Sequence, residues 1–300
     1  MRLSGRLAVL CVVLFSTTVW AQPDVATQVE AAEKQLESGD ISGAVAALEK
    51  VVTAAPRTFS ARLLLGRALD LEGRHAAARV HLEEAVKLAS DEERMSALTA
   101  LGISYAFESK ADEAARYYQR AFDAAVQRDD RGGAAALANA LGRIYLESGN
   151  LGKAQEWYTT GHETAKKVPG LSGDQVALWE MRWHHARARI AIRRGDRAEA
   201  ERHVSAVKAS FDKGLNDDQR PALPYLLGYI ALYSKDYRTA VAELLKGNQD
   251  DPFVLGLIAQ SYQRLGDREK AAEYYRRVMA SPSHNINAAF SRPLARSFLR

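Results

Sequence analysis

Seven short turn sequences recur along the 300 residues of this chain, and their spacing constrains the fold more than any other feature. The turns begin 31 to 46 residues apart, at Gly39, Gly73, Ser109, Gly149, Gly195, Lys235 and Gly266. An alanine stands five residues after the start of each turn, at Ala44, Ala78, Ala114, Ala154, Ala200, Ala240 and Ala271. A leucine–glycine pair precedes four of the turns, as Leu65-Gly66, Leu101-Gly102, Leu141-Gly142 and Leu227-Gly228. A unit of this length, recurring in phase, indicates stacked copies of one small supersecondary structure.

Apolar residues at helical spacing flank each turn, so a helix is expected on either side of it. Two antiparallel helices joined by a tight turn approach closely only where the contact point carries a small side chain, which accounts for the recurring glycine and alanine. A helix hairpin of this kind cannot bury its apolar face alone, and hairpins must therefore stack. The sequence thus predicts an all-α protein built from about seven helix hairpins.

This pattern resembles that of the tetratricopeptide repeat family, whose unit has about 34 residues. Repeat two carries the resemblance with Leu65, Gly66, Gly73, Ala78 and Leu82, and the match extends over roughly residues 25–283. The resemblance implies a right-handed α-solenoid whose concave groove binds other proteins. It also implies that the protein has no enzymatic activity. Repeat five departs from the pattern, and we expect its first helix to be longer and differently packed.

The chain is expected to divide into five segments. They are a signal peptide at 1–21, repeats one to four at 22–168, a loop and the start of an extended helix at 169–180, repeats five to seven at 181–283, and a C-terminal cap at 284–300. The stretch 166–174 contains one proline and two glycines, so it is expected to be a loop, either a hinge or an insertion.

The tail that follows repeat seven places Phe290, Leu294 and Phe298 at a spacing of four, which puts them on one apolar face. Stacked repeats need a terminal cap over the last exposed interface, and the tail is expected to supply it. Docking of the tail elsewhere is the alternative. Pro293 is expected to kink or restart the tail helix.

The N-terminus has the pattern of an export signal: Arg2 and Arg6, an apolar run at 7–15, and a small-residue cleavage site ending at Ala21. Cleavage after Ala21 would place the protein in the periplasm or outside the cell. Membrane contact is expected only if the signal is retained as an anchor. Cleavage also removes the single cysteine, Cys11, which suits an oxidising compartment.

The charge distribution and the absence of known catalytic motifs argue against several classes of function. The 41 basic and 37 acidic residues give a net charge of +4, and no concentrated basic face indicates a nucleic-acid partner. No phosphate loop, metalloprotease motif or nucleophile elbow is present, so we expect neither an enzyme nor a cofactor or metal. The seven histidines are expected to be solvated or at edges; they are His75, His81, His162, His184, His185, His203 and His284.

Two stripes stand out on single helical faces. Arg182, His185, Arg189 and Arg193 form one stripe, and Tyr225, Tyr229 and Tyr233 form the other. The resemblance implies that the first helix of each repeat lines the groove, which adds Asp70 and Glu147 there. The residues we expect to bind a peptide are Arg67, Asn139, Arg143, Arg182, His185, Arg189, Arg193, Tyr225, Tyr229 and Tyr233.

Guanidinium groups bind carboxylates in a bidentate manner, and tyrosines add apolar contact with a polar tip. The predicted function is a protein-interaction scaffold of the cell envelope that binds an extended acidic segment or a C-terminus. Two alternatives stay open for the stripes: tyrosines packed between repeats, and arginines that are solvated or paired with acids. The alternative function is a structural module that self-assembles through its end repeats, as a homo-oligomer.

Overall fold

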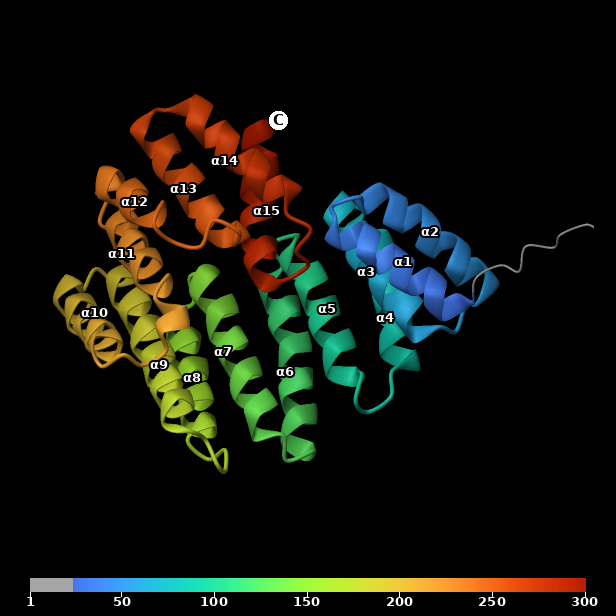
Figure 1. Ribbon diagram of the computed structural model, residues 1–300, viewed down its shortest axis with the longest axis horizontal. Coiled ribbons are helices and arrows are strands. Elements are labelled where there is room, and N and C mark those ends of the chain that lie inside the picture. Colours follow the sequence, from blue (N-terminus) through green and yellow to red (C-terminus); the bar gives the residue numbers. More distant parts are fainter. Residues whose placement is uncertain (1–23) are drawn as a thin grey trace, which may run out of the picture.

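The computed structural model describes residues 24–300, and within them the chain is an all-α stack of seven helix hairpins followed by one further helix (Figure 1). The first helices of the hairpins are α1 (Val25–Glu37), α3 (Phe59–Glu72), α5 (Arg94–Ala106), α7 (Arg131–Glu147), α9 (Gly173–Arg193), α11 (Ala222–Tyr233) and α13 (Pro252–Leu265). The second helices are α2 (Ile41–Ala54), α4 (His75–Leu88), α6 (Ala111–Gln127), α8 (Leu151–Ala165), α10 (Arg197–Asp212), α12 (Tyr237–Leu244) and α14 (Arg268–Ala280). A short 3-10 turn, η1 (Asp217–Gln219), precedes α11, and α15 (Ile286–Leu299) ends the described chain. The predicted all-α solenoid of seven hairpins is confirmed.

The seven predicted turns all lie between the two helices of a hairpin. The first residue of each adopts a left-handed backbone, with φ between 60° and 92°. Glycine reaches this conformation without strain, whereas Ser109 and Lys235 occupy it at a steric cost. After five of the turns, an aspartate or asparagine accepts a hydrogen bond from a backbone N–H in the first turn of the second helix; these residues are Asp40, Asn150, Asp196, Asp236 and Asp267.

The steric argument for the small residues is also confirmed. All seven recurring alanines have no exposed surface. The glycines at the crossings are equally constrained: a Cβ added to Gly142 would lie 2.7 Å from Cγ of Tyr158, the aromatic ring that α8 packs against α7. The hairpins close because these positions carry little or no side chain.

Replacing Gly142 by valine is expected to lower the free energy of unfolding by about 3 kcal/mol, because the buried Tyr158 ring has no space to move into. Gly132→Val is the matched control. It lies near the start of the same helix, and its Cβ would meet nothing closer than an aspartate oxygen at 3.8 Å. The control should leave stability unchanged or slightly raised, since valine favours a helix more than glycine. Urea denaturation of both variants measures the difference; equal stabilities would contradict the crossing argument.

The fifth repeat has the longer first helix that the sequence predicted. Helix α9 has 21 residues and begins with a capping box formed by Ser172 and Gln175. The loop before it does not interrupt the core, because Tyr158 of α8 belongs to the same buried cluster as Ala186 and Ile190 of α9. The boundaries of the five expected segments stay predictions, and residues 1–21 lie outside the described residues.

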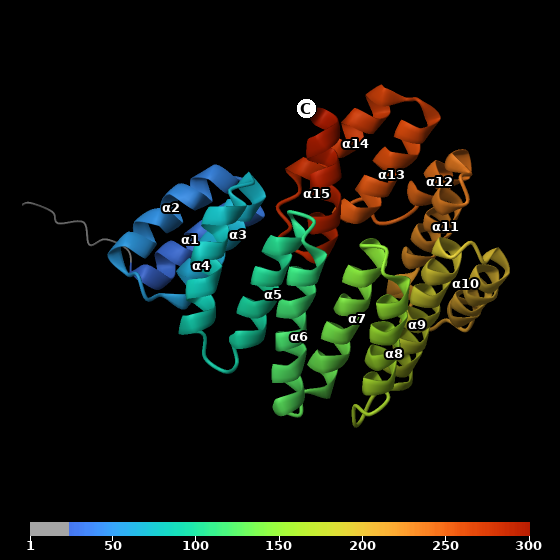
Figure 2. The same cartoon turned by 180° about the vertical axis from the view of Figure 1, so that it is seen from behind.

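The tail helix α15 does more than cap the stack. On one side it packs on α13 and α14, with the Phe298 ring centroid 4.9 Å from that of Tyr275. On the other side it lies beside α5 and α7, and Arg292 reaches the end of α3, so the tail also meets repeats two to four (Figures 1 and 2). The expected cap and the alternative docking site are therefore both realised. Pro293 lies inside one helix, so of the two expected effects, a kink or a restart, the restart is wrong.

Three polar contacts join the tail to repeat two. His284 Nε2 lies 2.9 Å from Asp70 Oδ2, Arg292 Nη2 donates to the Leu71 carbonyl at 2.8 Å, and Arg296 Nη1 lies 3.1 Å from His75 Nε2. The residues of each pair are more than 200 positions apart in the sequence. The curved stack is thus closed on itself by its own C-terminal helix.

Several histidines are not where the sequence placed them. His75, His162 and His185 are buried rather than solvated, because each has a polar or aromatic neighbour inside the stack. Within residues 24–300, no group of three or more histidines, cysteines and carboxylates could hold a metal ion. No helix in that part of the chain combines the length and the apolar character needed to cross a membrane.

Candidate functional site

The arginine and tyrosine stripes meet between repeats four, five and six. Arg189 of α9 donates from Nη2 to the Tyr158 hydroxyl at 2.9 Å and from Nη1 to the Tyr225 hydroxyl at 3.3 Å. One turn further along, Arg193 Nη1 donates to the hydroxyls of Tyr229 and Tyr233, at 3.2 and 3.1 Å. Guanidinium groups and aromatic rings therefore lie side by side, as the two helical faces suggested.

Glu147, at the C-terminal end of α7, is the carboxylate shared by three arginines. Its oxygens lie 3.4 Å from Arg143 Nε, 3.9 Å from Arg189 Nη1 and 3.7 Å from Arg193 Nη1. The Glu147 side chain is only 7% exposed. Three guanidinium groups and one carboxylate leave an excess of two positive charges, and among residues 24–300 no second carboxylate forms an ion pair with these arginines. We call these arginines, Glu147 and the bonded tyrosines the arginine–tyrosine cluster; its members are Arg143, Glu147, Tyr158, Arg189, Arg193, Tyr225, Tyr229 and Tyr233.

The tyrosines add no negative charge to this cluster. Burial raises the pKa of Tyr158 and raises that of Tyr229 further, so both hydroxyls stay protonated near neutral pH. Burial, together with Arg189 and Arg143, lowers the pKa of His185 well below its usual value, and its imidazole is neutral. The positive excess therefore rests on the guanidinium groups alone.

Part of the predicted peptide surface is enclosed, in agreement with the alternatives left open for the stripes: tyrosines packed between repeats and arginines paired with an acid. Arg189 is 4% exposed, Tyr229 has no exposed surface, and His185 is buried. The physical reason is that the arginines and tyrosines satisfy one another's hydrogen bonds between the repeats. Arg182 and Tyr233 remain exposed. The peptide-binding role of all ten residues stays a prediction.

The structure gathers six of the ten predicted residues around one polar cavity and sets Arg67 apart. The six are Asn139, Arg143, Arg182, His185, Arg189 and Tyr225, and the cavity has a volume of about 350 Å³. Asn287 of the tail helix also lines it. Arg67 instead lines a separate hollow with His284 and donates to Ser96 Oγ at 3.2 Å. We call the first of these two spaces the polar cavity.

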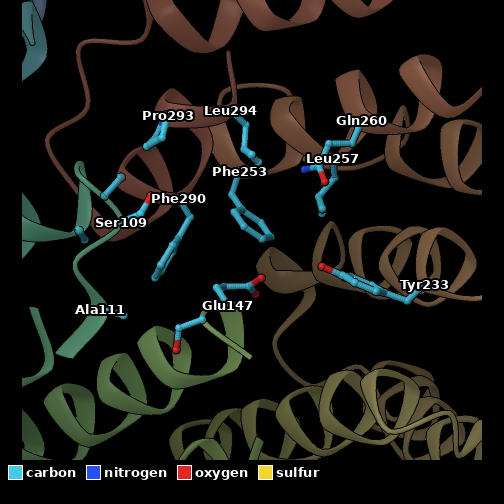
Figure 3. A pocket seen from close by; sticks show the side chains of 13 residues that line it. Ser109, Ala111, Glu147, Tyr233, Phe253, Leu257, Gln260, Phe290, Pro293 and Leu294 are labelled. Carbon is cyan, nitrogen blue, oxygen red and sulfur yellow. The ribbon is translucent and has the colours of Figure 1, made fainter. Parts of the chain in front are cut away.

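A second, more apolar pocket lies on the other side of the cluster, between the tail helix, α13 and the end of α7 (Figure 3). Its volume is about 230 Å³. The side chains of Phe253, Phe290 and Leu294 face into it, Tyr233 lies at one side, and the Glu147 carboxylate lies below (Figure 3). We call this space the apolar pocket. It is large enough for one aliphatic or aromatic side chain.

Sequence reasoning missed three residues that shape these spaces. The ring centroid of Phe253 lies 4.1 Å from Cζ of Arg143, and the same ring lines the apolar pocket. In the sequence, Phe253 is indistinguishable from an ordinary core residue at the start of a helix. Asn287 and Phe290 belong to the tail, whose apolar face was expected to cap the stack or, as the alternative, to dock elsewhere. The signal available was the spacing of Phe290 and Leu294, which predicts a shared face without indicating what that face meets.

Comparison with known proteins agrees with this architecture. Four family models described as tetratricopeptide repeat match residues 35–101, 93–167, 182–206 and 254–285. No curated protein matches the chain. Together with the seven observed hairpins, these matches establish the type of repeat.

Solved structures show the same fold. A tetratricopeptide repeat protein from Parabacteroides merdae superposes with a TM-score of 0.55 at 13% identity, covering 92% of this chain and 97% of that one. A putative kinesin light chain with TPR-like repeats from Podosopora anserina gives a TM-score of 0.54 at 20% identity, over 64% and 97% of the two chains. At such identities the likeness concerns the fold. From its repeats and its architecture, the chain belongs to the tetratricopeptide repeat family.

Proposed function

We propose that this protein is a non-enzymatic scaffold of the cell envelope that holds an extended acidic segment of a partner protein on its concave face. Tetratricopeptide repeats indicate a protein-interaction scaffold in general. The observation that carries the finer proposal is the positive excess of the arginine–tyrosine cluster beside an apolar pocket. An acidic segment is attracted by that excess, and an apolar side chain in the segment anchors it in the pocket.

The exposed side chains at the apolar pocket and at the polar cavity indicate where the partner segment would lie. Leu294 and Tyr233 are 45% and 37% exposed at the apolar pocket, and exposed large apolar side chains at a pocket are typical of binding sites. Arg182 lines the polar cavity and stays exposed there, and the partial desolvation of its guanidinium lowers its pKa. A segment that reaches from the polar cavity to the apolar pocket would pass over Phe253. This residue contacts Arg143 and lines the apolar pocket.

The envelope part of the proposal is supported by the N-terminal sequence. Arg2, Arg6, the apolar run and the small residues that end at Ala21 are typical of an export signal. The residues that remain after cleavage contain no cysteine, which suits an oxidising compartment. The scaffold would therefore meet its partner in the periplasm or outside the cell.

Site-specific photo-crosslinking in the native host tests the proposal. A photo-reactive amino acid at Leu294 or Tyr233 should yield an adduct with one partner, and the crosslinked peptide should be rich in aspartate and glutamate. Val80 and Val126, which are exposed on the second helices α4 and α6, are the matched control positions and should not yield that adduct.

The crosslinked segment, synthesised as a peptide, should bind the purified protein, and Leu294→Glu should weaken that binding at least tenfold through repulsion of its acidic residues. Equal binding by the variant would overturn the groove assignment. An adduct with a second copy of the chain would instead favour self-association.

A further inference from the structure

The docked tail meets repeat two at a buried group of three titratable side chains. The Asp70 carboxylate of α3 lies 3.0 Å from Nδ1 of His75 and 2.9 Å from Nε2 of His284, in the segment that leads into α15. Both imidazole rings pack on Phe107, with centroid distances of 5.6 and 5.5 Å. The side chains of Asp70, His75 and His284 are 0%, 8% and 3% exposed, so the group is largely closed to water. We call these three residues the Asp70–histidine group.

The hydrogen bonds of His75 fix its protonation state. Arginine only donates, so His75 Nε2, which lies 3.1 Å from Arg296 Nη1, must accept. His75 Nδ1 therefore carries the proton and donates to Asp70, and the imidazole as a whole is neutral. A proton added at Nε2 would set two N–H groups and two positive charges against each other. It would thus break a contact that α15 makes with repeat two.

His284 is equally unsuited to a second proton. Its Nε2 donates to Asp70, and its Nδ1 is buried without a hydrogen-bond partner. A proton on Nδ1 would create a buried N–H with no acceptor, which folded proteins almost always avoid. Burial lowers the pKa of His284 below its ordinary value of 6.5; the Asp70 carboxylate opposes this shift, and the Arg67 guanidinium adds to it.

The charges that face this group also oppose a further proton. From the tail, Arg292 and Arg296 approach it, and neither forms an ion pair with a carboxylate among residues 24–300. Burial and the neighbouring Arg296 lower the pKa of Arg292 to about 10, so positive charge is already crowded here. Helix α3 adds Arg67. Helix α1 adds Glu33 and Glu37, which line the hollow beside His284 but are exposed, so water weakens their effect. The other charged neighbours pair outside the group: Glu72 with Arg74, and Glu108 with Arg79 and Lys110.

We infer that Asp70, His75 and His284 act as a proton-controlled latch, which holds the tail on repeat two near neutral pH and releases it in mild acid. In the released state His75 no longer faces Arg296 and His284 reaches water, so each ring can take up a proton and acid favours release. For His284, whose pKa is lower when the tail is docked, docking is at full strength above about pH 6.5 and weakens as the pH falls below that value. Because α15 forms one wall of the apolar pocket, that pocket is complete only while the latch is closed. The latch is independent of the proposed function, since it consists of contacts within the chain.

Labelling of a buried thiol with 4,4′-dithiodipyridine, in the full chain with Cys11→Ser, tests the latch. Ala288 and Ala295 lie on α15 with no exposed surface, but Ala288 belongs to the buried cluster of the first four repeats and Ala295 to that of the last three. The labelling rate of Ala288→Cys, divided by that of a peptide thiol at the same pH, should rise about tenfold or more between pH 7.5 and pH 5.5. The reason is that release coupled to one proton gains up to about tenfold per pH unit. Ala295→Cys is the matched control and should show no such rise.

Two substitutions keep the hydrogen bonds to Asp70 and remove the titration. In His75→Asn the amide nitrogen takes the place of Nδ1, and in His284→Gln it takes the place of Nε2. Together they should reduce the acid-induced rise to less than about twofold. Arg296→Gln should also reduce it, since an amide can turn its oxygen toward a protonated His75. This variant keeps both histidines and therefore tests the latch even if their replacement impairs folding.

His81→Asn is the matched control for these variants, because His81 lies on the same helix α4 and contacts Arg62 outside the group. It should keep the full rise. A labelling rate of Ala288→Cys that does not change with pH, or that rises equally in Ala295→Cys, would overturn the inference. So would an undiminished rise in the histidine double variant or, where that variant does not fold, in Arg296→Gln.

Discussion

Replacing Glu147 by glutamine is expected to lower the free energy of unfolding by about 3–5 kcal/mol, the usual cost of removing one partner from a buried ion pair. Glutamine preserves the size of the side chain but leaves three neighbouring guanidinium groups without their carboxylate. Urea denaturation measures the loss. The matched control is Glu156→Gln on the adjacent α8, whose side chain is exposed, and it should change stability by less than about 0.5 kcal/mol.

The same substitution separates charge from packing. If the positive excess attracts the acidic partner segment, Glu147→Gln should tighten binding of that segment even as it destabilises the fold, because one competing negative charge is gone. A variant as stable as the parent would show that the three arginines do not depend on Glu147. The account of the arginine–tyrosine cluster would then be wrong.

Asp70→Ala is expected to cost a similar 3–5 kcal/mol and to release the tail. The Asp70 carboxylate has no exposed surface and is within hydrogen-bond distance of His75 Nδ1 at 3.0 Å, Ser104 Oγ at 2.9 Å and His284 Nε2 at 2.9 Å. Its loss leaves three buried polar groups without their acceptor, one of them on the segment that leads into α15. Urea denaturation measures the stability, and limited proteolysis should cleave the variant first near residue 284.

The contribution of Asp70 should also depend on pH in a defined direction. Burial alone would raise its pKa, but the hydrogen bonds from His284 and His75 hold that pKa below the ordinary value of 3.8. The stabilisation is therefore present above about pH 4 and is lost as the pH falls through the lower, folded-state pKa. The parent should lose more stability in acid than Asp70→Ala does. Asp123→Ala, at an exposed position of α6, is the control and should follow the parent.

The repeat architecture was predictable because it depends on local spacing. Each hairpin has its own turn residue, such as Gly73, and its own small residue at the helix crossing, such as Ala78. Because this pattern recurs seven times at regular spacing, it predicts stacked helix hairpins. The two stripes were predictable as helical faces for the same reason. Their contact with each other followed from the stacking of α9 on α11.

What lies across the stack was not predictable. Nothing local in the sequence indicates that His284 meets Asp70, or that Arg292 reaches the carbonyl at the end of α3, since these pairs are separated by more than 200 residues. The burial of Arg189 could not be predicted from the sequence either. Helical spacing shows which residues share a face, but it does not show how deeply the next repeat covers that face. Which residues of distant repeats meet depends on how the stack curves, and local spacing in the sequence does not show that curvature.

The docked tail changes how such a chain should fold and unfold. Most stacks of this kind are quasi-linear: each unit touches its neighbours only, and the ends can fray while the middle survives. Here α15 binds the second hairpin, so opening either end of the described stack also breaks contacts at the other. The described stack should consequently melt in one cooperative step, and nascent chains should reach that state only after α15 has emerged from the ribosome.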